Sequence, residues 1–128
     1  MLPPQAQATL DNYFAQLRLA RASELAQSSR FLEAEVLLSP NGRLPDNPCE
    51  LDMLARIAAQ QEQFGKARKL WEAALLKVPG NEEYTQCLQQ AKKWEHLSNA
   101  LDKVVNFVLW MGLALCIAAI IYLFKPLK

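Results

Sequence analysis

The amino-acid sequence predicts an all-α protein, with helical hairpins totalling about five helices followed by one C-terminal transmembrane helix. Three observations lead to this prediction. Apolar residues recur at the three- and four-residue spacing of amphipathic helices. A block of sequence returns after 33 residues, and the stretch from Val104 to Phe124 is almost entirely apolar. We divide the chain into a lead-in (1–14), a helical domain (15–99), a juxtamembrane and transmembrane helix (100–124) and a short basic tail (125–128).

Length and charge limit the classes of function. The 128 residues suit one compact domain plus a membrane segment. A formal charge of +1 gives no electrostatic reason to expect nucleic acid among the partners. The chain starts without a basic region or an early apolar run, so no secretory signal is predicted. We therefore expect the N-terminal domain to lie in the cytosol.

Catalytic and metal-binding patterns are missing from the sequence. Cys49, Cys87 and Cys116 lie far apart, and we interpret them as small buried residues in a reducing compartment. The sole histidine, His96, follows Glu95 directly, and neighbours in a helix point apart. No phosphate-binding glycine motif and no zinc-protease motif is found. The sequence therefore predicts neither an enzyme nor a cofactor or metal site.

The repeated block places matching residue types at matching helical positions. Residues 30–38 align with residues 63–71, and in each copy a small residue lies between two bulky ones on one helical stripe. The matching pairs are Phe31 with Phe64, Ala34 with Ala67, and Leu38 with Trp71.

The second copy gives the clearest helical hairpin. Its first helix is expected over about 49–60, capped by Asp46 or Asn47 with Pro48 in the first turn. A turn near 61–64 leads to a second helix over 65–77, which Pro79-Gly80-Asn81 ends. Its inward stripe is expected to contain Leu51, Leu54, Ala55, Ala58, Ala67, Trp71, Ala74 and Leu75.

The flanking copies follow the pattern less closely. A further first helix is expected from Glu82 to about Asn99, with Tyr84, Cys87, Leu88 and Ala91 in the matching positions. The N-terminal helix, about 5–27, places Arg18 and Arg21 where apolar groups are expected. The helix after it is cut short by Ser39-Pro40-Asn41-Gly42. The register of this first copy stays open by one residue.

These positions resemble the tetratricopeptide repeat over about residues 15–93. Leu51, Leu54, Ala55, Ala58, Phe64, Ala67, Trp71, Ala74 and Pro79 occupy its characteristic slots. Leu51 replaces the usual tryptophan, Ala58 the usual tyrosine, and Glu62 the glycine between the helices. A bundle of three or four helices is the alternative, although the repeated spacing argues against it.

The resemblance implies that the inner face of the first helices binds a protein partner. The matching residues are Asp52, Arg56, Gln60, Glu82, Thr85, Gln89 and Lys92. This face has mixed charge and lacks the lysine and asparagine pairs that hold a terminal carboxylate in chaperone-binding members, so that mode of recognition is disfavoured. A merely solvated face is the alternative interpretation.

The apolar stretch from Val104 to Phe124 is long enough to cross a membrane as a helix. Lys103 precedes it, and only a short basic tail follows, which is the arrangement of a tail anchor. Gly112, Cys116 and Ala119 share one face, where small residues permit another helix to approach closely. An anchor that faces lipid on all sides is the alternative.

Two functional hypotheses follow from this layout, which resembles that of the tail-anchored fission adaptors of the mitochondrial outer membrane. The first is a membrane-anchored adaptor or scaffold that positions a protein partner. The second is a small accessory subunit of a larger membrane complex, or a homo-oligomer, assembled through the transmembrane helix. A bacterial cytoplasmic membrane is the preferred location, and the mitochondrial outer membrane is the alternative.

Overall fold

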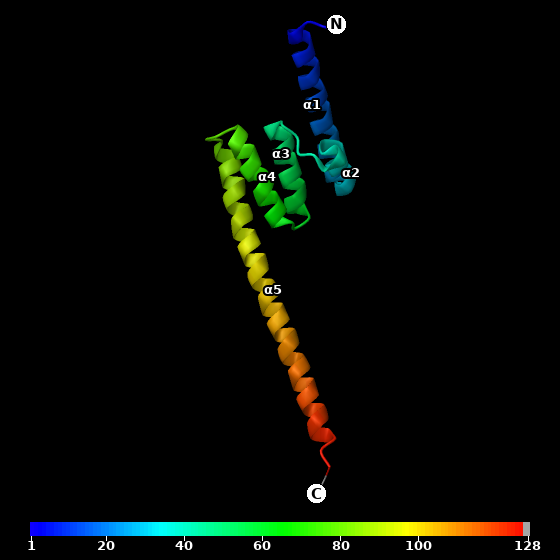
Figure 1. Cartoon of the computed structure of the whole chain (residues 1–128), viewed down its shortest axis with the longest axis vertical. Coiled ribbons are helices and arrows are strands. Elements are labelled where there is room, and N and C mark those ends of the chain that lie inside the picture. The colour runs from blue at the N-terminus through cyan, green and yellow to red at the C-terminus, as the bar shows by residue number, and fades with distance from the viewer. Residues whose placement is uncertain (127–128) are drawn as a thin grey trace. The chain divides into compact units, whose positions relative to one another are not determined.

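The described residues, 1–126 of a computed structural model, contain helices and no strands (Figure 1). This confirms the predicted all-α fold with five α-helices. The predicted bounds agree closely with those observed for the first, third and fourth helices, whereas the helix predicted over 82–99 continues without interruption through the apolar segment to Leu123. The elements are α1 (Pro4–Gln27), α2 (Phe31–Leu38), the short 3₁₀ helix η1 (Pro40–Gly42), α3 (Pro48–Gln60), α4 (Phe64–Lys77) and α5 (Glu82–Leu123).

The chain forms two compact units, one comprising residues 1–93 and the other beginning at Trp94. Within the first unit, α1 packs on α2 and α3 packs on α4, so that two helical hairpins lie in series. Further contacts of α3 with α1 and α2 join the hairpins.

The two hairpins share one backbone geometry at a spacing of 33 residues. Ser29 and Glu62 both adopt a φ of 60° in the turn between paired helices. In the first turn, the Arg30 N–H donates to the Leu25 carbonyl at 2.8 Å. In the second, the Gln63 N–H donates to the Ala58 carbonyl at 2.9 Å. Because the two turns have the same geometry, the structure fixes the register of the first copy, which the sequence had left open.

Alanines are fully buried in the core of both hairpins. Ala22 and Ala55 are fully buried at equivalent positions of α1 and α3, and Ala34 and Ala67 are fully buried in α2 and α4. Larger side chains, among them Trp71, complete the same core. Helix axes approach closely only where the side chains are small, so these alanines set the spacing of the hairpins.

The first turns of α5 complete the core of the first unit. Tyr84 and Ala91 are buried, and Cys87 and Leu88 pack beside them, as the third copy of the pattern predicts. The Asn81 side chain accepts a hydrogen bond from the Tyr84 N–H at 3.1 Å and so satisfies one free donor at the helix start.

Asn47, one of the two predicted caps, begins α3. Its Oδ1 accepts a hydrogen bond from the Cys49 N–H at 2.9 Å, and Pro48 follows in the first turn.

The prediction that the cysteines are buried is wrong for Cys49, which is exposed. It lies in the first turn of α3, at the edge of the core beside Tyr84. Cys116 is also exposed, and Cys87 is half-buried.

One described helix, α5, is long and apolar enough to cross a membrane, as predicted. Its most apolar window has a mean hydropathy of 2.5, and none of that window is buried within the protein. A helix in the core of a soluble domain would instead be covered by its neighbours. From Val104 to Phe124 the side chains are exposed in the described structure.

Candidate partner-binding surface

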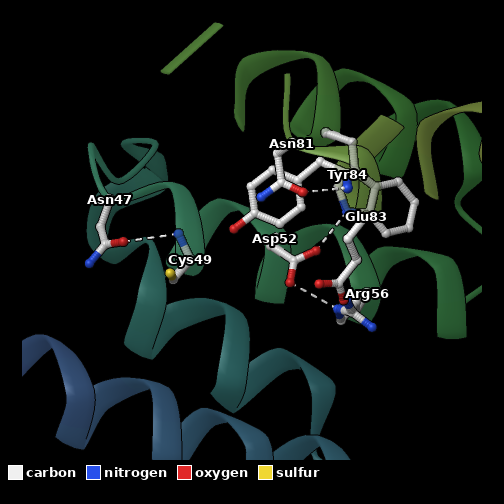
Figure 2. Close-up of polar contacts among 8 residues, drawn as sticks. Asn47, Cys49, Asp52, Arg56, Asn81, Glu83 and Tyr84 are labelled. Atoms are coloured by element: carbon white, nitrogen blue, oxygen red, sulfur yellow. Dashed lines mark hydrogen bonds and ion pairs between the residues drawn. The ribbon is translucent and has the colours of Figure 1, made fainter. Parts of the chain in front are cut away.

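Asp52 lies at the centre of the polar contacts on the predicted inner face of α3. Its carboxylate is half-buried and accepts two hydrogen bonds. The indole N–H of Trp71, on α4, donates to Oδ1 at 2.8 Å, and Nε of Arg56 donates to Oδ2 at 2.9 Å. Figure 2 shows the Asp52 carboxylate and the Arg56 guanidinium facing one another. Asp52 thereby joins the two helices of the second hairpin.

Arg56 extends this contact to the next helix. Its Nη2 donates to Oε1 of Glu83, in the first turn of α5, at 2.6 Å. The hydrogen bond and the charge of Asp52, together with the hydrogen bond to Glu83, raise the pKa of Arg56 above its ordinary value. The Arg56 side chain is 43% exposed, so water screens these pairs and their contribution to stability is modest. Their main effect is to fix the orientation of α3 relative to the start of α5.

Tyr84 and Cys87 lie beside this network on α5. Burial raises the pKa of Tyr84 to about 12, and the neighbouring Cys49 and Asp52 add to the shift. Burial is also the largest cause of the raised pKa of Cys87. Both groups therefore stay neutral near pH 7. A protonated thiol is a weak nucleophile, so this arrangement favours packing over covalent chemistry.

The seven predicted surface residues divide into two sets. Asp52, Arg56 and Thr85 are used within the protein, the last because its hydroxyl donates to the Asn81 carbonyl at 2.9 Å. The others have exposed side chains: Gln60, Glu82, Gln89 and Lys92. Among the neighbouring acids of α5, it is Glu83 and not Glu82 that meets Arg56.

A buried acid, which the sequence did not predict, explains why the first copy has an arginine where an apolar residue is expected. Glu50, at the start of α3, is only 4% exposed. Arg18 of α1 donates to it through Nε at 3.1 Å, and Nη2 lies 3.0 Å from the same oxygen. The signal was present in the sequence, since Arg18 occupies a slot where the repeat expects an apolar group. A polar cleft of about 960 Å³ lies along this pair, between α1 and the loop that contains Arg43 and Asp46.

A second missed feature is an apolar stripe on α1. Leu10, Tyr13, Phe14 and Leu17 recur at helical spacing, and all four are exposed. The rings of Tyr13 and Phe14 meet edge to face, with their centroids 6.3 Å apart. Exposed apolar patches of this kind are common where proteins bind other proteins.

The predicted membrane-packing residues lie on the exposed surface of α5. Gly112, Cys116 and Ala119 are all exposed in the described structure. A Cβ atom added at Gly112 would meet no described atom within 4 Å. This part of α5 thus has room for a second helix to approach its backbone.

The described residues include no group of three or more His, Cys, Asp or Glu side chains that could hold a metal ion. Comparison with known proteins gave no match to any family model, to any curated protein or to any solved structure.

Proposed function

We propose that this protein is a membrane-anchored, tetratricopeptide-like adaptor that holds a protein partner at the membrane surface. In this proposal α5 inserts through its apolar part and the first unit lies in the cytosol. The role requires recognition and no chemical step. A bacterial cytoplasmic membrane is the preferred site, with the mitochondrial outer membrane as the alternative.

The contact from Arg56 to Glu83 is the observation that carries the proposal. It joins α3 to the first turn of α5, on the face where tetratricopeptide-like proteins bind their partners. Asp52 already accepts hydrogen bonds from Trp71 and Arg56, so this face has a fixed shape before a partner binds. Preorganised surfaces lose less conformational entropy on binding. The exposed Gln60, Gln89 and Lys92 are then available for hydrogen bonds to the partner.

An accessory subunit of a membrane complex is the second candidate. It is favoured by the exposed small residues Gly112, Cys116 and Ala119, which permit close packing against another transmembrane helix. In that case the binding surface lies within the membrane and the inner face of α3 contributes little.

Site-specific photo-crosslinking in native membranes tests the proposal. A photoreactive amino acid is placed at Gln60 or Gln89 in the full chain, with exposed Lys69 of α4 as the matched control. We expect one protein to be captured from both inner-face positions and not from the control. Capture of the same proteins from all three positions would contradict the adaptor proposal. Capture from position 112 or 119 alone would favour the subunit.

A further inference from the structure

The polar cleft between α1 and the loop over residues 40–47 contains charged side chains that the proposed function does not use. It has a volume of about 960 Å³ and is lined by α1, the end of α2, this loop and the start of α3. Sites for small molecules have volumes of about 300 to 1,000 Å³, so this cleft lies at the upper end of that range. A ligand larger than a single amino acid therefore fits the cleft.

Arg18, which lines the cleft, has hydrogen-bond donors that the protein leaves unused. Its Nε and Nη2 both contact Oε1 of Glu50, at 3.1 Å and 3.0 Å, and its Nη1 takes part in no described hydrogen bond. The Arg18 side chain is 44% exposed, whereas Glu50 is buried. A buried carboxylate thus holds a half-exposed guanidinium at the edge of the cleft. Because a guanidinium has five N–H donors in a rigid plane, Arg18 can bind a second anion without leaving Glu50.

Arg43 brings a second cation to the same cleft from the loop. Its guanidinium forms no ion pair or hydrogen bond with the residues that the structure describes, although Asp46 in the same loop pairs with Lys77 at 3.5 Å. The Arg43 carbonyl accepts a hydrogen bond from the Ser39 hydroxyl at 2.6 Å, which holds the loop in place at this residue. Two arginines with unused donors in one cleft favour a carboxylate, since its two oxygens match the planar guanidinium group.

The cleft also contains groups that suit a peptide backbone. Oε2 of Glu50 accepts none of the described hydrogen bonds and is free to accept one from a ligand N–H. Asn12 and Asn41 are exposed in the cleft, and each side-chain amide combines a donor with an acceptor, as a peptide unit does. A chain of amides with one acidic side chain would satisfy these groups and both arginines together.

The acids of the cleft limit the charge of the ligand. Glu50 is paired with Arg18, and Asp46 with Lys77, so Asp11 is the lining acid that has no ion pair within the described residues. Its charge repels a phosphate, with a charge near −2, more strongly than a carboxylate with a charge of −1. The cleft therefore favours a carboxylate over a phosphate.

We propose that this cleft binds an extended peptide segment of a protein partner through one aspartate or glutamate side chain. Arg18 and Arg43 hold the carboxylate, Glu50 positions Arg18, and Asn12 and Asn41 bind the main chain of the segment. The cleft shares no residue with the inner face of α3 and does not depend on the membrane anchor. It goes beyond the proposed function as a second contact with a partner, and it stands even if the inner face binds nothing.

Binding of blocked peptide pools to the full chain in phosphatidylcholine nanodiscs tests the site. The probe is a pool of nonapeptides with a central glutamate between randomised uncharged residues, acetylated at one end and amidated at the other. The matched pool has a central glutamine. We expect at least about tenfold greater retention of the glutamate pool, because hydrogen bonds to charged groups are worth at least that factor. Equal retention of the two pools would overturn the proposal.

Variants of the full chain locate the binding. Arg43→Gln should lower retention of the glutamate pool about tenfold, and it should leave the fold unchanged because that side chain has no described partner. Arg18→Met combined with Glu50→Leu should act in the same way, since it removes the cation without leaving a buried carboxylate unpaired. Arg30→Gln, which removes an ion pair with Glu33 outside the cleft, is the matched control and should change nothing. Undiminished retention by Arg43→Gln would contradict the assignment.

Three further pools separate the acidic side chain from other ligands. Stronger retention of a pool with a central phosphoserine would assign the cleft to a phosphate, and stronger retention of a central lysine would assign it to a cation. Retention only of glutamine peptides with a free C-terminus would assign it to the end of a chain. Each of these results would overturn the proposal. Failure of photo-capture from Gln60 and Gln89 would leave the retention of the glutamate pool unchanged, which distinguishes it from a failure of this site.

Discussion

At the scale of single residues, Asp52 and Trp71 explain each other's position. Trp71 is 5% exposed, and the indole N–H of a buried tryptophan needs an acceptor. Asp52 supplies that acceptor from the neighbouring helix, and the same carboxylate orients Arg56. The residue predicted to bind a partner is thus also a structural residue. Substitution of Asp52 would test both roles at once, so Trp71 is the better probe of the fold.

Replacement of Trp71 should separate its packing from its hydrogen bond. Trp71→Ala creates a cavity in the core and is expected to cost about 3–5 kcal/mol. Trp71→Phe keeps most of the ring volume but leaves one Asp52 oxygen without its donor, at a cost of about 1–3 kcal/mol. Urea unfolding of the full chain in detergent, followed by circular dichroism, measures both. Leu76→Ala, at an exposed position of α4, is the control and should change stability by less than about 0.5 kcal/mol.

Arg18 is expected to stabilise the protein through the buried Glu50. Arg18→Met leaves that carboxylate without its cation and should cost about 1–3 kcal/mol, reduced from the value for a fully buried pair because Arg18 is partly exposed. Arg21→Met, which removes an ion pair with exposed Glu24, is the matched control and should have little effect. The double variant Arg18→Met with Glu50→Leu should recover most of the loss. If the double variant does not recover stability, the loss in Arg18→Met does not come from the unpaired Glu50 carboxylate.

Alkaline pH should destabilise the first unit through Tyr84. Its pKa is raised to about 12 in the folded protein, above the ordinary value of 10.0. Folding therefore disfavours ionisation of the Tyr84 hydroxyl. The contribution of the neutral Tyr84 to the free energy of unfolding is complete below pH 10 and is lost as the pH rises towards 12. Urea unfolding at pH 9 and pH 11 should show a smaller loss of stability in Tyr84→Phe than in the unchanged chain. Equal losses would exclude Tyr84 as the source.

At the scale of elements, the turns between paired helices hold side chains in a conformation that favours glycine. Glu62 has a φ of 60°, and Ser29, 33 residues earlier, adopts the same conformation. Neither residue is a typical occupant of the left-handed region, so the fold maintains some backbone strain at both turns. The strain is tolerated because the packed hairpins on either side determine the path of the chain.

Glycine should therefore relieve the strain in these turns. Glu62→Gly is expected to stabilise the protein by about 0.5–1 kcal/mol, since the gain at positive φ exceeds the added entropy of the unfolded chain. The neighbouring substitution Gln63→Gly, at a φ of −85°, is the control and should destabilise. Thermal unfolding in detergent compares the two. A loss of stability with Glu62→Gly would show that the left-handed turn is not strained.

At the scale of the whole molecule, the chain is expected to divide between two solvents. The first unit buries its apolar side chains within itself, whereas the apolar part of α5 leaves its side chains exposed along its length. Such a surface is stable only when lipid or another apolar surface covers it.

Charges within the span should therefore release the protein from the membrane. Leu109→Arg with Leu113→Arg adds about 2.5–3.5 kcal/mol per residue to the cost of insertion near the helix centre. We expect the variant to leave the carbonate-resistant membrane fraction, where the unchanged chain should remain. Leu76→Arg, at an exposed position of α4, is the control and should not change the distribution. Extraction of the unchanged chain by carbonate would contradict a membrane anchor.

The sequence by itself determined the helices, their order and the apolar span, because helical periodicity, caps and length are local properties of the chain. It also marked the alanines at the helix contacts, since close packing restricts the residue types allowed there. Only the tertiary structure decided which polar residues pair. Trp71 with Asp52, Arg56 with Glu83, and Arg18 with Glu50 join residues 19 to 32 positions apart. Such pairs depend on how one helix is rotated against another, and the periodicity of a single helix does not contain that rotation.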